Sequence, residues 1–155
     1  MRIILSLGTN LGDRIESIKS ASKLLEDAFN CEAKMSHFYE SPPYGPQDQP
    51  SFLNIALEIN TCLNLSPTSI LKICKEIEEK LGRKHRYHWG PREIDIDIIF
   101  IDFLEVKEER LTIPHKDFRN RSFVLEPLKD LPSFSEYKEH YKIKTLKNKN
   151  TKLIL

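Results

Sequence analysis

The sequence Trp89-Gly90-Pro91-Arg92-Glu93-Ile94-Asp95-Ile96-Asp97-Ile98-Ile99-Phe100-Ile101 is the most informative stretch of the chain. Its second half alternates with a period of two and is rich in β-branched residues, which predicts a strand. One face is expected to carry Ile94, Ile96, Ile98 and Phe100, and the other Asp95, Asp97, Ile99 and Ile101. Residues i and i+2 of a strand lie roughly 6.5 Å apart, so the two carboxylates are expected to project side by side.

The pair Asp95 and Asp97 points to a metal site. Neighbouring carboxylates repel each other unless a cation or a shared proton intervenes, and their hard oxygen atoms suit two Mg²⁺ ions. The alternative is the solvated acidic face of an edge strand. The preceding run favours the metal, because between Gly82 and Arg92 it has no acidic residue but contains Arg83, Lys84, Arg86 and Arg92, with His85 and His88. Acids that hold a metal beside bases that hold phosphates are what a metal–polyphosphate complex requires.

The composition indicates one domain, residues 1–155, that acts on a small ligand. The formal net charge is +1, so no global attraction to nucleic acid or to an anionic membrane is expected. Three cysteines without a C-x-x-C pair, and no signal peptide, favour reduced thiols in the cytoplasm. No apolar run approaches the roughly 18 residues of a membrane span. We expect a cytoplasmic monomer.

Hydrophobic periodicity predicts the order strand, helix, strand, strand, helix, strand. The expected ranges are Arg2–Gly8, Arg14–Phe29, Glu32–Glu40, Phe52–Asn60, Ser66–Gly82 and residues 94–101. This order is typical of a ferredoxin-like βαββαβ α+β sandwich, with helices on one face of a mostly antiparallel sheet. Beyond Pro132 the pattern weakens, and the lysine-rich segment Lys138–Lys152 is interpreted as a solvated tail.

A proline-rich loop, Ser41–Pro50, precedes the third strand and suggests a binding surface. Its four prolines and one glycine exclude a helix or a central strand, and proline lowers the entropy cost of holding a shape. At its end Phe52 and Asn54 share a strand face. An aromatic ring beside an amide is suited to a flat heterocycle, whose ring stacks while the amide pairs with edge groups. The alternative is a phenylalanine that only packs beneath the loop.

Together these features resemble the 6-hydroxymethyl-7,8-dihydropterin pyrophosphokinase family. The motifs that carry the resemblance are Gly8–Gly12, Ser41–Asn54, Gly82–Arg83, Trp89–Asp97, Arg110–His115 and Asn120–Phe123. The resemblance implies transfer of the terminal pyrophosphoryl group of ATP to the hydroxymethyl oxygen of the pterin, with release of AMP, in folate biosynthesis. His88 and Lys116 depart from the residues that some members carry at these positions.

The resemblance also implies roles for individual residues. Arg83, Arg92, Asp95 and Asp97 would be catalytic, and the two aspartates would hold two Mg²⁺ ions. The pterin positions are Ser41, Pro42, Pro43, Tyr44, Phe52, Asn54, Trp89 and Phe123, with the two phenylalanines forming a sandwich. The ATP positions are Glu78, Arg83, Lys84, Arg86, Trp89, Arg92, Ile98, Arg110, Leu111, Thr112, His115 and Arg121.

Two other classes of function remain open from the sequence. One is a different Mg²⁺-dependent nucleotidyl transferase or phosphoesterase that uses Asp95 and Asp97; it would turn over without a pterin. The other is a non-catalytic ferredoxin-like nucleic-acid module. Such modules carry clustered sheet aromatics and a basic face. The chain has no matching aromatic motif, which argues against this class.

Overall fold

The structure is a computed structural model that describes residues 1–43, 48–82, 94–147 and 150–155. Its central sheet has the strand order β5-β1-β4-β3-β8, and β2 also pairs with β4. The first part of the chain forms β1 (Arg2–Thr9), α1 (Arg14–Phe29), β2 (Ala33–Met35), β3 (Tyr39–Ser41), β4 (Phe52–Asn60), α2 (Pro67–Lys80) and β5 (Asp95–Ile101). Strand β1 is antiparallel to both β4 and β5, so the predicted ferredoxin-like arrangement is confirmed.

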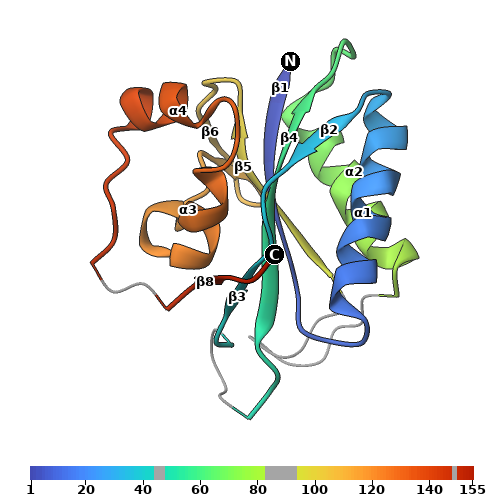
Figure 1. The fold of residues 1–155 in the computed structure, drawn as a ribbon. Helices are drawn as coiled ribbons and strands as arrows, with labels where there is room; N and C mark the ends of the chain where they lie inside the picture. The colour runs from blue at the N-terminus through green and yellow to red at the C-terminus, as the bar shows by residue number, and fades with distance from the viewer. Residues whose placement is uncertain (44–47, 83–93, 148–149) are drawn as a thin grey trace.

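Helices α1 and α2 lie on one face of the sheet (Figure 1). Each begins at a residue that caps its first turn: the Asp13 carboxylate accepts from the Glu16 backbone N–H at 3.1 Å, and the Ser66 hydroxyl accepts from the Ser69 N–H at 3.2 Å. Pro67 follows Ser66 at the start of α2, where a missing N–H does no harm. Both helices bury their apolar stripes against the isoleucine and leucine side chains of β1, β4 and β5.

The predicted strand Glu32–Glu40 is interrupted, because a side chain replaces a backbone acceptor in its middle. The Ala56 backbone N–H of β4 donates to the Ser36 hydroxyl at 2.8 Å. Regular pairing therefore breaks between β2 and β3, although both short strands pair with β4.

The opposite face of the sheet is also covered, which the sequence did not predict. After β5 the chain forms β6 (Val106–Lys107), β7 (Thr112–Ile113), a 3-10 helix η1 (Phe118–Asn120), α3 (Ser122–Leu128), α4 (Phe134–Tyr141) and β8 (Lys152–Leu153). Figure 1 shows α3 and α4 across the sheet from α1 and α2. The interpretation of residues 138–152 as a solvated tail is wrong, because Tyr141, Ile143 and Thr151 are buried and β8 pairs with β3.

A β-bulge in β5 exchanges the faces predicted for its last residues. Leu5 pairs with Ile98 whereas Ile4 pairs with Phe100, so Ile99 is an extra residue in the ladder. Ile99 and Phe100 therefore both pack in the apolar cluster beneath α3 and α4. Ile101 packs on the other side, with α1 and α2.

Two further expectations concern the whole chain. The thiols of Cys31, Cys62 and Cys74 form no disulfide, as predicted. Within the described ranges, no helix combines the length and the apolar character needed to cross a membrane.

Candidate active site

Two rows of residues run across β4, β1 and β5 on the sheet face that α3 and α4 partly cover. In the first row, Gly8 of β1 stands between Asn54 of β4 and Asp95 of β5. In the next row, Ser6 stands between Ala56 and Asp97. Neighbouring strands are about 4.8 Å apart, so the Asn54 amide and the Asp95 carboxylate stand roughly 10 Å apart across a bare glycine. The strand register thus places the predicted amide and both predicted acids on one surface.

Gly8 keeps this surface open. A Cβ atom at Gly8 would lie 3.1 Å from Oδ1 of Asn54 and 3.8 Å from Cδ1 of the Phe52 ring. The Asn54 side chain is buried, and its Nδ2 donates to the Ser41 hydroxyl of β3 at 2.8 Å. The amide is therefore held in one orientation at the floor of the site, beside the Phe52 ring.

The two predicted aromatic residues come from different elements, β4 and α3. Phe52 begins β4 and is half-buried, and Phe123 lies in the first turn of α3 and is also half-buried. Helix α3 packs against β3 and β4, so the fold brings together two elements that are far apart in sequence. The Arg121 guanidinium lies 5.7 Å from the centroid of the Phe123 ring. Stacking of both rings on one ligand remains a prediction.

The acidic pair is under electrostatic strain in the metal-free protein. Burial, the charge of Asp95 and the charge of Glu78 together raise the pKa of the Asp97 carboxyl to about 7. A bound cation would remove this repulsion, so the oxygen donors present fit Mg²⁺. Among the described residues, no third His, Cys, Asp or Glu side chain completes a metal-binding group with them. Such a sparse ligand set suits Mg²⁺, which commonly keeps waters and substrate phosphates in its coordination sphere.

Glu78 holds the strand that carries the acids. Its carboxylate is 2 % exposed and accepts a hydrogen bond from the Ile96 backbone N–H at 2.7 Å. It also forms an ion pair with Lys75 at 3.3 Å. Because β5 is an edge strand of the sheet, Glu78 satisfies a backbone group that no neighbouring strand pairs. The sequence associated Glu78 with the ATP positions only through the family resemblance.

A cavity of about 200 Å³ opens beside Asp97, between α2, β5 and the segment around β7. It gathers five of the predicted ATP positions with one of the acids: Asp97, Ile98, Arg110, Leu111, Thr112 and His115. Burial and the charge of Arg121 lower the pKa of His115. Nδ1 of His115 accepts from the Asp117 backbone N–H at 3.1 Å, so the neutral ring carries its proton on Nε2 and can donate it to a ligand.

Five further residues line this cavity and were not among the predicted site residues: Leu71, Lys75, Ile96, Glu109 and Lys116. Leu71, Lys75 and Glu78 are spaced by four and three residues along α2 and therefore share one helix face. Following that helix face from Glu78 would have identified Leu71 and Lys75. An amphipathic helix shows the same spacing for ordinary packing, however, so the pattern alone does not indicate a site.

The remaining predicted residues divide into two groups. Ser41 is buried on β3, Pro42 and Pro43 follow it, and Arg121 precedes α3 and forms an ion pair with Asp117 at 3.3 Å. The others lie outside the described residues: Tyr44, Arg83, Lys84, Arg86, Trp89 and Arg92.

Comparison with known proteins shows the family of this chain. Residues 4–133 match the family described as 7,8-dihydro-6-hydroxymethylpterin-pyrophosphokinase. The 2-amino-4-hydroxy-6-hydroxymethyldihydropteridine pyrophosphokinase of Bacillus subtilis is 40 % identical over 128 residues, which cover 82 % of this chain and 75 % of that protein. The enzyme of the same name from Haemophilus influenzae is 39 % identical over 130 residues, covering 83 % and 80 %.

Some relatives are longer proteins. The bifunctional protein FolKE of Lactococcus lactis is 46 % identical over 128 residues, and the match covers 82 % of this chain but only 36 % of that protein. A crystal structure of an HPPK-DHPS protein in complex with substrates has a TM-score of 0.64 at 15 % identity, covering 98 % of this chain and 48 % of that one, which supports the fold. From the matched range and the identities, the chain belongs to the 7,8-dihydro-6-hydroxymethylpterin-pyrophosphokinase family.

Proposed function

We propose that this chain transfers the terminal pyrophosphoryl group of ATP to the hydroxymethyl oxygen of 6-hydroxymethyl-7,8-dihydropterin, with release of AMP, as a step of folate biosynthesis. One observation supports the proposal: the acids stand between a sheet surface that carries the Asn54 amide and a cavity that carries basic side chains. Asp95 faces the Asn54 amide across Gly8, and Asp97 lines the cavity that also holds Arg110 and His115. A pterin on the first surface and ATP in the second would meet at the acidic pair.

The protein's contribution to the reaction is mainly position and electrostatics. Asn54 would pair with the edge of the pterin, and Phe52 and Phe123 would cover its faces. These contacts would align the hydroxymethyl oxygen with the β-phosphorus, so that the new O–P bond forms as the bond to the AMP oxygen breaks.

Asp95 and Asp97 would hold two Mg²⁺ ions. The ions would supply charge neutralisation on the phosphates and would lower the pKa of the hydroxymethyl group. Arg110 and Lys75, which line the cavity, add positive charge from the chain itself. The predicted arginines Arg83 and Arg92 would act on the phosphates in the same way.

An AMP-release assay tests the proposal. The chain is incubated with ATP and Mg²⁺, with and without 6-hydroxymethyl-7,8-dihydropterin, and AMP and the pterin diphosphate are measured. We expect both products only when both substrates and the metal are present. Equal AMP release without the pterin would instead favour the other Mg²⁺-dependent nucleotidyl transferase or phosphoesterase.

We also propose that residues 1–155 act as one monomeric domain in the cytoplasm. The unbridged thiols of Cys31, Cys62 and Cys74 support a reducing compartment. Light scattering of the purified chain, with and without ATP and pterin, tests the monomer: a dimer mass under both conditions would contradict it.

A further inference from the structure

Residues 150–155 run alongside β3, next to the candidate pterin surface, and we call them the strap. Lys152 and Leu153 form β8, which pairs antiparallel with Glu40 and Tyr39 of β3. The pairing continues at Phe38, whose N–H donates to the Leu155 carbonyl at 2.9 Å. The strap therefore braces β3, the strand whose Ser41 hydroxyl holds the Asn54 amide. It lies outside residues 4–133, which match the family.

The strap also holds the start of α3. The Ser122 hydroxyl donates to Oδ1 of Asn150 at 2.8 Å, and it lies 2.7 Å from the hydroxyl of Thr151. A serine hydroxyl has one proton, so Thr151 must donate its own proton to the Ser122 oxygen. Ser122 and Thr151 are both buried, which makes the loss of either partner costly.

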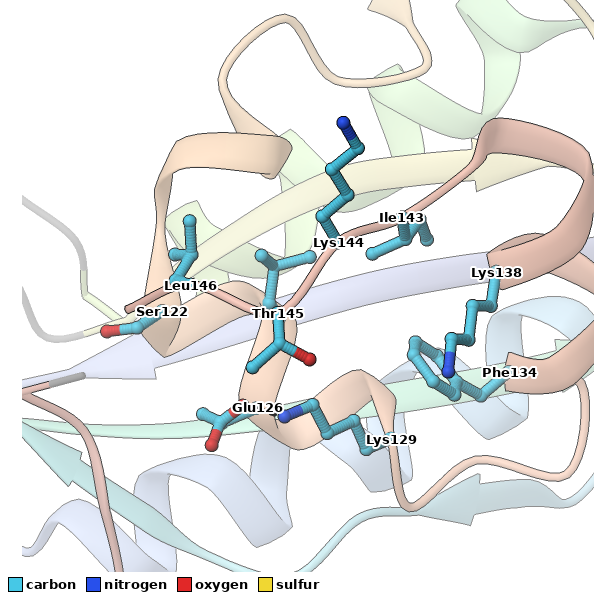
Figure 2. A pocket seen from close by; sticks show the side chains of 10 residues that line it. Ser122, Glu126, Lys129, Phe134, Lys138, Ile143, Lys144, Thr145 and Leu146 are labelled. Atoms are coloured by element: carbon cyan, nitrogen blue, oxygen red, sulfur yellow. Dashed lines mark ion pairs between the residues drawn. The ribbon is translucent and has the colours of Figure 1, made fainter. Parts of the chain in front are cut away.

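Backbone hydrogen bonds also form at this end of α3, where the Val124 and Leu125 N–H groups donate to the Arg121 carbonyl at 3.0 Å. Arg121, which precedes the helix, provides no side-chain cap. The side of α3 that faces α4 borders a cavity of about 200 Å³, lined by Leu125 and Leu146 among others. Figure 2 shows this cavity, with the Ser122 hydroxyl directed away from it. The hydrogen bonds from Ser122 to the strap are among the contacts that fix where α3 begins.

We propose that Thr151 is a positioning residue for the pterin surface. Through Ser122 it fixes the first turn of α3, and with it the ring of the next residue, Phe123. The strap also pairs with β3, whose Ser41 hydroxyl holds the Asn54 amide. One segment therefore sets the spacing between the Phe123 ring and the Asn54 amide. The inference rests on the proposed function, in which Phe123 stacks on the pterin.

Substitution of Thr151 tests this role. Thr151→Val removes the hydroxyl at nearly constant volume, Thr151→Ser retains it, and Thr145→Val makes the same exchange at an exposed position nearby. Calorimetric titration should show pterin binding weakened roughly three- to tenfold in Thr151→Val, as expected for one lost hydrogen bond. Binding of a non-hydrolysable ATP analogue should stay within about twofold in all three variants, and Thr151→Ser and Thr145→Val should bind the pterin like the wild type.

A second measurement separates this inference from the proposed function. In the ligand-free protein, NMR of ring-labelled phenylalanine should show a changed Phe123 signal in Thr151→Val but not in Thr145→Val. If the wild type fails to bind the pterin, the proposed function fails, and the Phe123 signal still decides whether Thr151 positions the ring. An unchanged Phe123 signal, with or without a lower melting temperature, would overturn the inference.

Discussion

Replacing Asp97 by asparagine should stabilise the metal-free protein while abolishing its activity. Asp97 lies beside Asp95 on β5, and burial together with its acidic neighbours raises its pKa from 3.8 to about 7. The unfolded chain therefore loses this proton at a lower pH than the folded chain. Wild-type stability should fall as the pH rises from about 4 to about 7, because the folded state then holds a disfavoured charge. An amide at this position has no such charge.

The size of the effect follows from the pKa. Each pKa unit corresponds to about 1.4 kcal/mol, so the charge of Asp97 can lower the free energy of unfolding by at most about 4 kcal/mol. The Asp97 side chain keeps some access to water, which screens the charge, and we expect a gain of about 1–2 kcal/mol at pH 8. For a chain of this length, this gain corresponds to a rise in melting temperature of roughly 2–8 °C.

Thermal melts in a metal chelator at pH 4, 6 and 8 measure this prediction, with AMP release measured in parallel. The difference between Asp97→Asn and the wild type should be near zero at pH 4 and largest at pH 8. Asp27→Asn is the control, because it removes an equal charge from an exposed ion pair with Lys23 on α1. If Asp97→Asn melts at or below the wild type at pH 8, the reasoning about repulsion is refuted. Near-normal turnover at ordinary Mg²⁺ would refute the metal assignment.

Three further predictions concern the surfaces around the acids. Phe52→Ala and Phe123→Ala should each weaken pterin binding roughly tenfold or more, with ATP affinity little changed, and unchanged titrations for both would exclude the sandwich. Gly8→Ala should shift the Asn54 amide, because the new Cβ would stand 3.1 Å from its oxygen. Pterin affinity should therefore fall while the melting temperature changes little. An unchanged affinity would contradict the inference that the missing side chain of Gly8 leaves room for the ligand. Glu78→Ala should lower the free energy of unfolding by about 1–3 kcal/mol, because the buried Ile96 N–H loses its acceptor, whereas Glu78→Gln should retain most of the wild-type stability. Equal melting curves for the two variants would show that the hydrogen bond from Glu78 to β5 does not stabilise the fold.

Local periodicity was enough to predict the elements whose pattern is long and regular. The helix Arg14–Phe29 and the strand Phe52–Asn60 have the predicted bounds. In contrast, Ile98-Ile99-Phe100-Ile101 is four consecutive apolar residues, so alternation could not reveal the bulge that exchanges two faces.

The second helical layer was not predictable because it depends on distant contacts. The rings of Tyr137 and Tyr141 on α4 stack on Phe100 of β5, with centroids 4.3 and 5.0 Å away. The exposed lysines Lys138, Lys142 and Lys144 lie close to these rings in sequence, so the local composition resembles a solvated tail. The packing of α3 against β4, which brings Phe123 to the site, follows from this layer and equally has no local signal.

Part of the candidate site was predictable, because it depends only on the spacing of residues along one strand. Asp95 and Asp97 share a strand face by spacing alone, as do Phe52 and Asn54. The cavity that joins α2 to the segment around β7 is a tertiary feature, and Lys75 could not be distinguished from an ordinary surface lysine.

The alternation within β5 explains how the fold tolerates its acidic pair. Each acid has isoleucine neighbours that point to the opposite face, and Ile94, Ile96 and Ile98 are at most 4 % exposed in the core beneath α1 and α2. Burial of each such side chain contributes about 1.5–3 kcal/mol, so the three together outweigh the cost of about 1–2 kcal/mol expected for the charge of Asp97. The same residues thus anchor the strand and hold two carboxylates at a spacing where a cation or a shared proton relieves their repulsion. A shift of one residue in register would bury the acids and expose the isoleucines, so the core itself keeps the candidate metal ligands on the site face.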